Sequence, residues 1–521
     1  MIVEAKKSSG ISNEGVASLF YENGITLSKE AYEYIIEEKL NEKILHEYIE
    51  YLKEERIWVA EKSSILDIHL STKEKDLPTK ERDVEFKKRE TQEKAEEAST
   101  EGRMELTESV RAGHIPAKEV DPDIKILKEI KTDSEGNFDD FLENFRDRYK
   151  KLSKIFKERP NTRNFQSINS IEKGGTVKVV GIVRRKLYAR TKNTILTIED
   201  LSGSTKVFIS KKSSIDTDAI FKDGVVYVEG KSGRGIIFAK NIEFPDLPMD
   251  REVNRSKEDL NAVLISDMHV GSKNFLEKEF LRFLRWLNLK MGNKKQRNTA
   301  SKTKYLVIAG DLIDGIGIYP NQRDDLEILS IYDQYKRLYE LLSLVPDYIQ
   351  IILSPGNHDA ARPAIPQPPI PEEFAPDLCG MDNVLSVGNP TLFSMHGVKT
   401  LIYHGDTVFD IIEALRVPQN DVVSPMLHMF KKRHLGPIYG KKTGIIPEKE
   451  DYLVIDEIPD LFHTGHVHIN GHEMYRGTTL INSGTWQEQT EYQIMRNMVP
   501  TPCRVPIFNL KTHKTMITNF G

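Results

Sequence analysis

Aspartate, asparagine and histidine residues recur in five short motifs between residues 266 and 468. The motifs are SDMH (266–269), GD (310–311), GNHD (356–359), HGD (404–406) and GHVH (465–468). Imidazoles mixed with few carboxylates favour Mn, Fe or Zn over Mg and Ca, which prefer shells made of oxygen alone. The motifs therefore predict a metal site, with the candidate ligands Asp267, His269, Asp311, Asn357, His404, His466 and His468.

These ligands suit two divalent cations, Mn most of all, that share the carboxylate of Asp311. The expected sets are Asp267, His269 and His468 for one cation, and Asn357, His404 and His466 for the other. Such a pair of cations activates water at neutral pH, which indicates a two-metal hydrolase. Each motif alone has an ordinary alternative, because strand-end histidines are often satisfied polar groups and Asn and Asp are common in turns.

Three further residues of these motifs have predicted roles outside the ligand set. His358 is expected to protonate the leaving oxygen or to stabilise the pentavalent state. Asp359 and Asp406 are expected to fix the orientation of ligand imidazoles. Capping of a turn is an equally good interpretation of these two carboxylates.

Each motif follows a short apolar run, and these runs identify the elements that position the site. The runs are AVLIS, KYLVIA, IQIILS, TLIY and LFHT. Apolar strands that alternate with helical stretches from about residue 258 predict an α/β domain, in which ligands gather beyond the carboxyl ends of the strands. Gly310, Gly356, Gly405 and Gly465 would let the backbone turn sharply there.

The bulk composition limits the classes of protein that fit. A chain of 521 residues requires two to four domains, and a net charge of -5 places any basic surface in a local patch or on a partner. Two cysteines, no apolar leader and no apolar run of about 18 residues predict a cytoplasmic protein without a membrane span.

Changes in pattern along the chain divide it into five predicted segments. They are a helical docking module (1–60), a charged disordered linker (61–120), a helical connector (121–165), an OB-fold β-barrel (166–246) and the α/β domain (258–521). The first rests on Leu45, Tyr48, Ile49 and Leu52, which recur at helical spacing. The barrel rests on short β-branched runs separated by Gly, Asp and Ser.

Basic and aromatic residues supply candidate contacts to DNA. They are Arg184, Arg185 and Lys186 in the barrel, beside Tyr188 and Arg190, and Lys431, Lys432, Arg433, Lys441 and Lys442 in the α/β domain. A barrel surface that packs on another subunit and a solvated lysine-rich loop are the alternatives. Trp486, Gln487, Gln489 and Tyr492 could stack on a frayed base, although packing against the barrel or another subunit is preferred. His46, His428, His434, His463 and His513 have no predicted role in the site.

The ordered motifs resemble the calcineurin-like metallophosphoesterase superfamily, which implies a β-sandwich flanked by helices. Within it, the layout and the segments GDLIDGIGIYPNQ, HLGPIYGKKTGIIP and GTWQEQTEYQIMRNMVPTPCRVPIFNL are similar to the small subunits of archaeal D-family DNA polymerases. This resemblance implies proofreading 3′–5′ exonuclease activity on single-stranded 3′ ends. It also implies a large polymerase subunit as partner, a sliding clamp reached through that complex, and a place near the nucleoid. A phosphatase, a repair nuclease and a non-enzymatic scaffold are the alternatives.

Overall fold

The structure, a computed structural model, describes residues 115–190 and 192–521 and a few earlier positions. Those positions are 16, 19–20, 26–27, 35, 45–46, 48–49 and 59–60. The chain divides into two compact units, residues 1–111 and 112–521. Most of the predicted helical module and nearly all of the predicted linker therefore lie outside the described residues.

The described part of the first unit contains helical positions and two short strands. Leu45, Tyr48 and Ile49 are helical and buried, as their spacing predicts, whereas Leu52 lies outside the described residues. Strand β1 (Thr26–Leu27) pairs in parallel with β2 (Val59–Ala60). These strands were not predicted, because two residues are too few to show an apolar period.

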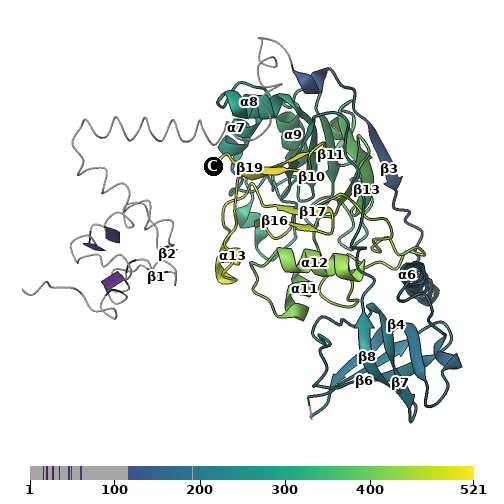
Figure 1. The fold of residues 1–521 in the computed structure, drawn as a ribbon. Coiled ribbons are helices and arrows are strands. Elements are labelled where there is room, and N and C mark those ends of the chain that lie inside the picture. The colour runs from purple at the N-terminus through teal and green to yellow at the C-terminus, as the bar shows by residue number, and fades with distance from the viewer. Residues whose placement is uncertain are drawn as a thin grey trace, which may run out of the picture. The chain divides into compact units, whose positions relative to one another are not determined.

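Two six-stranded sheets make up the largest domain (Figure 1). The first has the order β12-β11-β10-β9-β18-β19, and the second has the order β16-β17-β15-β14-β13-β3. The strands of the first sheet are β9 (Asn261–Ile265), β10 (Thr303–Ala309), β11 (Gln350–Ser354), β12 (Val384–Ser386), β18 (Arg504–Asn509) and β19 (Thr515–Asn519). Those of the second are β3 (Ile124–Lys128), β13 (Thr391–Met395), β14 (Val398–Ile402), β15 (Leu461–Thr464), β16 (Asn470–Tyr475) and β17 (Thr478–Ser483).

The two sheets pack face to face around one apolar core. Leu264 and Val307 from the first sheet and Phe393, Ile402 and Ile481 from the second are all buried in this core. Burial of this apolar area is the main force that holds the layers together. The predicted β-sandwich is confirmed.

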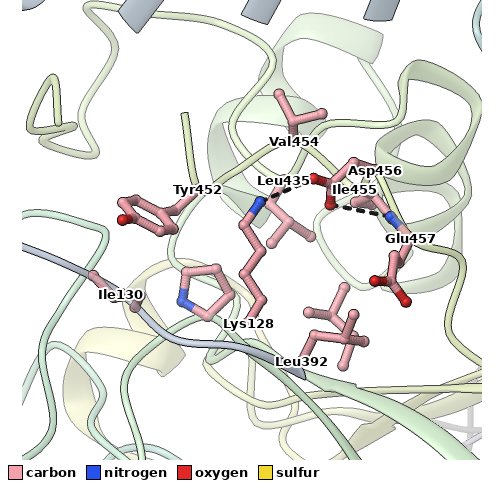
Figure 2. A pocket seen from close by; sticks show the side chains of 11 residues that line it. Lys128, Ile130, Leu392, Leu435, Tyr452, Val454, Ile455, Asp456 and Glu457 are labelled. Atoms are coloured by element: carbon pink, nitrogen blue, oxygen red, sulfur yellow. Dashed lines mark hydrogen bonds and ion pairs between the residues drawn. The ribbon is translucent and has the colours of Figure 1, made fainter. Parts of the chain in front are cut away.

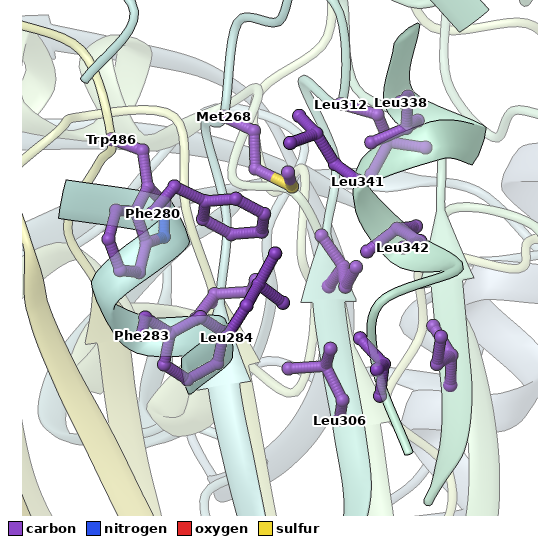
Figure 3. Close-up of a cluster of buried hydrophobic side chains, with 14 of the residues drawn as sticks. Met268, Phe280, Phe283, Leu284, Leu306, Leu312, Leu338, Leu341, Leu342 and Trp486 are labelled. Carbon is purple, nitrogen blue, oxygen red and sulfur yellow. The ribbon is translucent and has the colours of Figure 1, made fainter. Parts of the chain in front are cut away.

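Helices cover the outer face of each sheet. Those on the first sheet are α7 (Glu277–Leu287), α8 (Lys294–Ser301), α9 (Ile331–Leu342) and α10 (Pro376–Cys379); those on the second are α11 (Val408–Leu415) and α12 (Val423–Lys432). Figure 3 shows Phe280 and Phe283 of α7 and Leu341 of α9 gathered around Leu306 of β10. Because both faces of the first sheet are covered, its central strands are apolar at successive positions rather than at alternate ones.

A closed five-stranded barrel confirms the predicted OB-like domain. Its order is β4-β5-β6-β8-β7. The strands are β4 (Thr176–Tyr188), β5 (Thr194–Glu199), β6 (Ser204–Ile209), β7 (Val225–Gly233) and β8 (Ile236–Glu243). Val179, Ile198, Val207 and Val228 fill its interior, and a short 3-10 turn (η2, Ile168–Ser170) contributes Ile168.

The segment that was predicted to be a helical connector contains both a strand and a helix. Strand β3 pairs antiparallel with β13, and so belongs to the second sheet. Helix α6 (Phe138–Glu158) follows and begins with a capping box between Asn137 and Asp140. Its residues Tyr149 and Phe156 pack against Tyr227 of the barrel, so α6 joins the barrel to the sandwich.

The remaining described elements are short: the 3-10 turns η1 (Pro116–Lys118) and η3 (Gln322–Asp325) and the helix α13 (Glu491–Met495). Ala117 of η1 is buried in the core between the sheets, so the predicted linker ends before this turn. Among the described residues, no helix is both long enough and apolar enough to cross a membrane.

Candidate metal centre

All five predicted strands end at one place, where both sheets contribute residues. Asp267 and His269 follow β9, Asp311 follows β10, and Asn357 and His358 follow β11, all from the first sheet. From the second sheet, His404 follows β14, and His466 and His468 follow β15. The sandwich therefore brings together residues such as His269 and His468, which are 199 positions apart in the chain.

The local backbone at this place is unusual. Five of the candidate ligands have left-handed backbone angles: φ is 51° for Asp267, 51° for His269, 49° for Asp311, 72° for His466 and 59° for His468. A left-handed backbone angle costs a residue other than glycine roughly 1–2 kcal/mol in conformational energy. The surrounding fold holds them there against that preference, as is typical of functional sites.

Two of the predicted glycines are required by close contacts with candidate ligands. A β-carbon on Gly310, whose φ is 81°, would lie 2.5 Å from Nδ1 of His404. A β-carbon on Gly356 would lie 2.3 Å from Oδ1 of Asp311. Both distances are shorter than any van der Waals contact, so only glycine lets the two turns approach the cluster.

The first predicted ligand set lies in one buried group. Oδ1 of Asp267 is 3.4 Å from Nε2 of His468, and the Nε2 atoms of His269 and His468 are 3.1 Å apart. One donor atom from each residue lies within 4.8 Å of the others. This group could hold a metal ion.

The second predicted set forms a neighbouring group. Nε2 of His404 lies 3.3 Å from Oδ2 of Asp311, 3.1 Å from Oδ1 of Asn357 and 3.2 Å from Nδ1 of His466. The same Oδ2 of Asp311 is 3.7 Å from Nε2 of His269, which belongs to the first group. Asp311 therefore lies between the two groups, as a shared carboxylate would.

The hydrogen bonds of the His269 and His404 rings leave each ring with a nitrogen that can bind a cation. Nδ1 of His269 lies 3.0 Å from Oδ1 of Asp314, and Nδ1 of His404 lies 2.8 Å from the carbonyl oxygen of Ala309. Both partners only accept, so each Nδ1 carries the proton and each Nε2 turns its lone pair into the cluster. Converging lone pairs beside a carboxylate are the donors that Mn, Fe or Zn require.

The charge balance of the cluster is set by burial and by pairing. Burial raises the pKa of Asp267 to about 7, against the effect of His404. Burial also acts to raise the pKa of Asp311, but His404 and His358 hold it well below its usual value. For His404, burial acts to lower the pKa and Asp311 raises it well above the usual value. Protons and cations compete for such donors, so a bound cation would take the place of these protons.

His358 lies at the edge of both groups and is partly exposed. Its backbone N–H donates to Oδ1 of Asp311 at 2.9 Å, and its Nδ1 lies 2.7 Å from the carbonyl oxygen of Asp314. That carbonyl accepts the Nδ1 proton, which leaves Nε2 for another partner. The geometry therefore allows the predicted catalytic role, and His358 also lies within ligand distance of His269 and Asp311.

The two carboxylates with an open interpretation are both buried, and they bind different groups. Asp359 accepts from the N–H groups of Gly356 and Leu312 at 2.8 and 3.2 Å. Asp406 accepts from the side chain of Asn389, whose oxygen in turn accepts from the N–H of His404. Asp359 is thus a turn-binding carboxylate, whereas Asp406 reaches a ligand only through Asn389.

Asp314 and Gln493 contact ligand rings directly but were not predicted. Asp314 binds His269, and Nε2 of Gln493 lies 2.8 Å from Nδ1 of His468. The segment GDLID contained a usable signal, since its second aspartate stands three residues after a predicted ligand. Gln493 gave no such signal, because 25 residues separate it from His468.

Two of the basic residues predicted to contact DNA are buried. Nζ of Lys432 lies 4.3 and 4.1 Å from the ring centroids of Phe221 and Phe244. Arg433 donates from Nε to the carbonyl oxygen of Ile455. Both side chains are 3% exposed, so neither lies on a surface that DNA could contact. The prediction took charge as a sign of exposure, but these cations pack against aromatic rings and backbone.

The other basic candidates lie at the surface to different degrees. Arg184 and Arg185 on β4 are exposed, and so are Lys441 and Lys442. Lys186 and Lys431 are half-buried, and Nζ of Lys186 donates to the carbonyl oxygens of Thr217 and Ile220.

Most of the GTWQEQ segment and four of the five unassigned histidines lie inside the largest unit, away from the surface that DNA would contact. Trp486 is buried against Phe280 and Phe283, so it packs within its own domain rather than on the barrel or on a base. Gln487 donates to Ser272, Gln489 donates to the Met498 carbonyl, and Tyr492 is exposed. His463 and His434 are buried beside Ser483 and Asp451, and the ring of His428 lies beside that of Phe221. His513 is buried and His46 is exposed.

The pocket in Figure 2 is separate from the cluster. Lys128, Ile130, Leu392 of β13, Tyr452 and the segment 454–457 are among the residues that line it. Lys128 pairs with Asp456 at 3.2 Å. No candidate ligand lines this pocket. It is therefore a gap beside β3 rather than part of the metal centre.

Comparisons with known proteins place this geometry in a family. The family model for the B-subunits of DNA polymerases alpha and epsilon matches residues 262–469. The DNA polymerase II small subunit of Pyrococcus furiosus is 43% identical over 380 residues, which are 71% of this chain and 62% of that protein. Its counterpart from Archaeoglobus fulgidus is 42% identical over 388 residues, 74% of this chain and 78% of that protein.

A solved archaeal phosphodiesterase aligns with 50% of this chain and 99% of its own length, at 11% identity and a TM-score of 0.26. That likeness is too distant to indicate a function. The chain spans less than two thirds of the Pyrococcus furiosus protein but most of the Archaeoglobus fulgidus one. The identity to both, over most of this chain, shows that the chain belongs to the DNA polymerase II small subunit family.

Proposed function

We propose that the chain is the proofreading 3′–5′ exonuclease subunit of a heteromeric DNA polymerase. The observation that carries this proposal is the carboxylate of Asp311, which lies between a buried and a partly buried group of imidazole and carboxylate donors. Two donor groups that share one carboxylate suit the hydrolysis of phosphodiesters. Membership of a DNA polymerase subunit family favours DNA as the substrate over a phosphoprotein.

The two groups define which residues would hold each cation. Asp267, His269 and His468 would hold one, Asn357, His404 and His466 the other, and Asp311 both. When bound, divalent cations supply Lewis-acid activation of water and neutralise charge on the phosphoryl oxygens. Mn is the expected metal, with Fe or Zn as alternatives that the same donors accept.

The side chain of His358 would handle the proton of the leaving group. Hydrolysis adds water to the terminal phosphorus, breaks its bond to the 3′-oxygen of the preceding nucleotide and releases a nucleoside 5′-monophosphate. The departing 3′-oxygen needs a proton, and Nε2 of His358 is the ring nitrogen left without a partner by the bond from Nδ1 to the Asp314 carbonyl. Asp314 holds the rings of both His269 and His358 in place.

Two exposed basic segments would hold the DNA backbone. Lys441 and Lys442 are exposed, and the neighbouring Thr443 donates to the carbonyl oxygen of Asp406, close to His404. Phosphates that approach the centre would meet these lysines first. Arg184 and Arg185 on the barrel would contact the strand further away.

The proposal includes a partner as well as a substrate. A family of polymerase small subunits implies a large catalytic subunit, and the chain would act as a scaffold for it. A sliding clamp would be reached through that complex. The exposed faces of the barrel and of the sandwich are both available for such contacts.

Degradation of labelled DNA tests the function. Purified chain, alone and with the large subunit, is given 5′-labelled single-stranded DNA and Mn²⁺, with Asp311→Ala as the control variant. A ladder that shortens from the 3′ end and is lost in the variant supports the proposal. Cleavage of circular single-stranded DNA would favour a repair nuclease, and release of phosphate from a phosphopeptide alone would favour a phosphatase. No hydrolysis by the metal-loaded complex would favour a scaffold.

A further inference from the structure

Helix α13 carries exposed apolar side chains directly beside the candidate metal centre. Tyr492 is 56% exposed, Ile494 60% and Met495 78%. Between them, Gln493 is buried with its Nε2 atom 2.8 Å from Nδ1 of His468. A helix that contacts a candidate ligand therefore presents apolar side chains to solvent at the edge of the centre.

A second exposed apolar segment follows Asp314, the residue that binds the ring of His269. Ile316 and Ile318 are 48% and 39% exposed, in the loop that begins at Asp314. Asp314 binds Nδ1 of His269, and Nε2 of that ring lies 3.1 Å from Nε2 of His468. Side-chain contacts thus link both apolar segments to the same pair of imidazoles.

A positive charge accompanies the apolar side chains of α13. The guanidinium of Arg496 lies 5.2 Å from the centroid of the Tyr492 ring, and both side chains are exposed. A flat ring, aliphatic side chains and a cation next to a centre for phosphoesters match a ligand with a planar base beside a phosphate. A protein that docked on α13 would instead cover the side of the centre at which His468 lies.

We propose that α13 seats the base of the 3′-terminal nucleotide of a single DNA strand. The base would lie against the ring of Tyr492, and the preceding phosphates would run toward Lys441 and Lys442 beside the other donor group. This inference rests on the proposed exonuclease function, and it states which end of the bound DNA strand lies at α13. Because every base has an aromatic face, this contact would hold any terminal base that is unpaired.

Two small diesters separate the contact with the base from the chemistry. Thymidine 5′-(p-nitrophenyl phosphate) and methyl p-nitrophenyl phosphate share a leaving group and differ in the nucleoside. The variant Tyr492→Ala should lower kcat/KM for the thymidine ester about tenfold, which is the size of a lost base stack. It should leave kcat/KM for the methyl ester unchanged. Equal rates on the thymidine ester for this variant and wild type would overturn the proposal.

Fluorescence gives a second measurement that does not need turnover. An oligonucleotide with 2-aminopurine at its 3′ end, bound in Ca²⁺, should be quenched by stacking on wild-type protein and on Tyr492→Phe. It should remain bright with Tyr492→Ala. The same probe at the 5′ end should not respond. Quenching that survives Tyr492→Ala would contradict the seat on α13.

Controls separate this proposal from its rivals. Leu201→Ser removes an equally exposed side chain (60%) from the barrel and should change neither measurement. If α13 variants weaken binding of the large subunit but not of the thymidine ester, the helix is a protein interface and the proposal is wrong. If wild type shortens no DNA, the exonuclease function fails first. If wild type shortens DNA and the α13 variants do so at the same rate, the exonuclease function stands and only the base contact on α13 is wrong.

Discussion

Two buried clusters of charge lie in the same unit of the chain and are built differently. In one, Asp451 accepts from Arg148 Nε at 2.7 Å and lies 3.0 Å from Nε2 of His434. In the other, Asp267 and Asp311 are surrounded by imidazoles, and no lysine or arginine among the described residues forms an ion pair with either.

The difference separates a structural cluster from a binding cluster. Arg148 neutralises Asp451 from within the chain and links α6 to the sandwich. Among the described residues, no lysine or arginine pairs with the carboxylates of the candidate ligand cluster, so their charge is balanced by protons on the imidazoles or by bound metal. Burial alone therefore does not identify a functional site. The two clusters differ in that, in the part of the chain that the structure describes, no lysine or arginine pairs with Asp267 or Asp311.

The largest effect is expected from the shared carboxylate. Asp311→Ala should reduce exonuclease activity about a thousandfold or more, because both donor groups lose a ligand. Activity on labelled DNA and metal content by mass spectrometry measure the result. Asp451→Asn is the matched control, since it alters an equally buried carboxylate but should leave metal content unchanged. Full activity in Asp311→Ala would remove the distinction between the clusters.

Substitution of His358 should separate chemistry from metal binding. His358→Ala is expected to lower hydrolysis about 10²–10⁴-fold, as for the loss of a general acid, while the metal content stays near that of wild type. Parallel assays of activity and bound Mn on one preparation measure both. A variant that has also lost its metal would show that His358 is a ligand.

The structural cluster should affect stability rather than activity. Asp451→Asn should lower the free energy of unfolding by about 3–5 kcal/mol, because Arg148 is left buried without its partner. Denaturant unfolding in EDTA measures it. A loss of less than 1 kcal/mol would show that Arg148 gains little from the pair.

Acid should reveal the same ion pair in the wild-type protein. Although burial acts to raise the pKa of Asp451, Arg148 and His434 lower it below its usual value. A carboxyl with a lowered pKa stabilises the fold above its unfolded pKa of about 4, and this contribution is lost as the pH falls further. Stability of wild type should therefore fall below pH of about 4 more steeply than that of Asp451→Asn. Parallel pH profiles would contradict this.

The smallest effect is expected from a residue that orients a ligand. Gln493→Leu keeps the size of the side chain but removes the hydrogen bond to Nδ1 of His468. Metal affinity should fall about 10–100-fold, as for other partners of metal-bound histidine. Gln489→Leu, which loses only a bond to the Met498 carbonyl, is the control for the segment. Equal affinities in isothermal titration would exclude a role for Gln493.

The clustering of the candidate ligands was predictable because each one follows an apolar strand, and strand ends of an α/β domain meet at one edge. The orienting residues were harder to predict. Gln493 lies in a short helix whose approach to His468 depends on packing that no local pattern records. Strand β3 was missed for a similar reason, since its partner β13 lies more than 260 residues later and five residues at an edge carry little periodicity. Lys432 and Arg433 were misplaced because sequence shows charge but not burial.

The central claim is that the cluster around Asp311 binds cations. Equilibrium titration of metal-free chain with Mn²⁺, followed by electron paramagnetic resonance, tests it most directly. We expect two bound ions per chain with the magnetic coupling of ions that share a ligand, and loss of that coupling in Asp311→Ala. A wild-type chain that binds no Mn²⁺ at saturation, or binds it equally well without Asp311, would contradict the account.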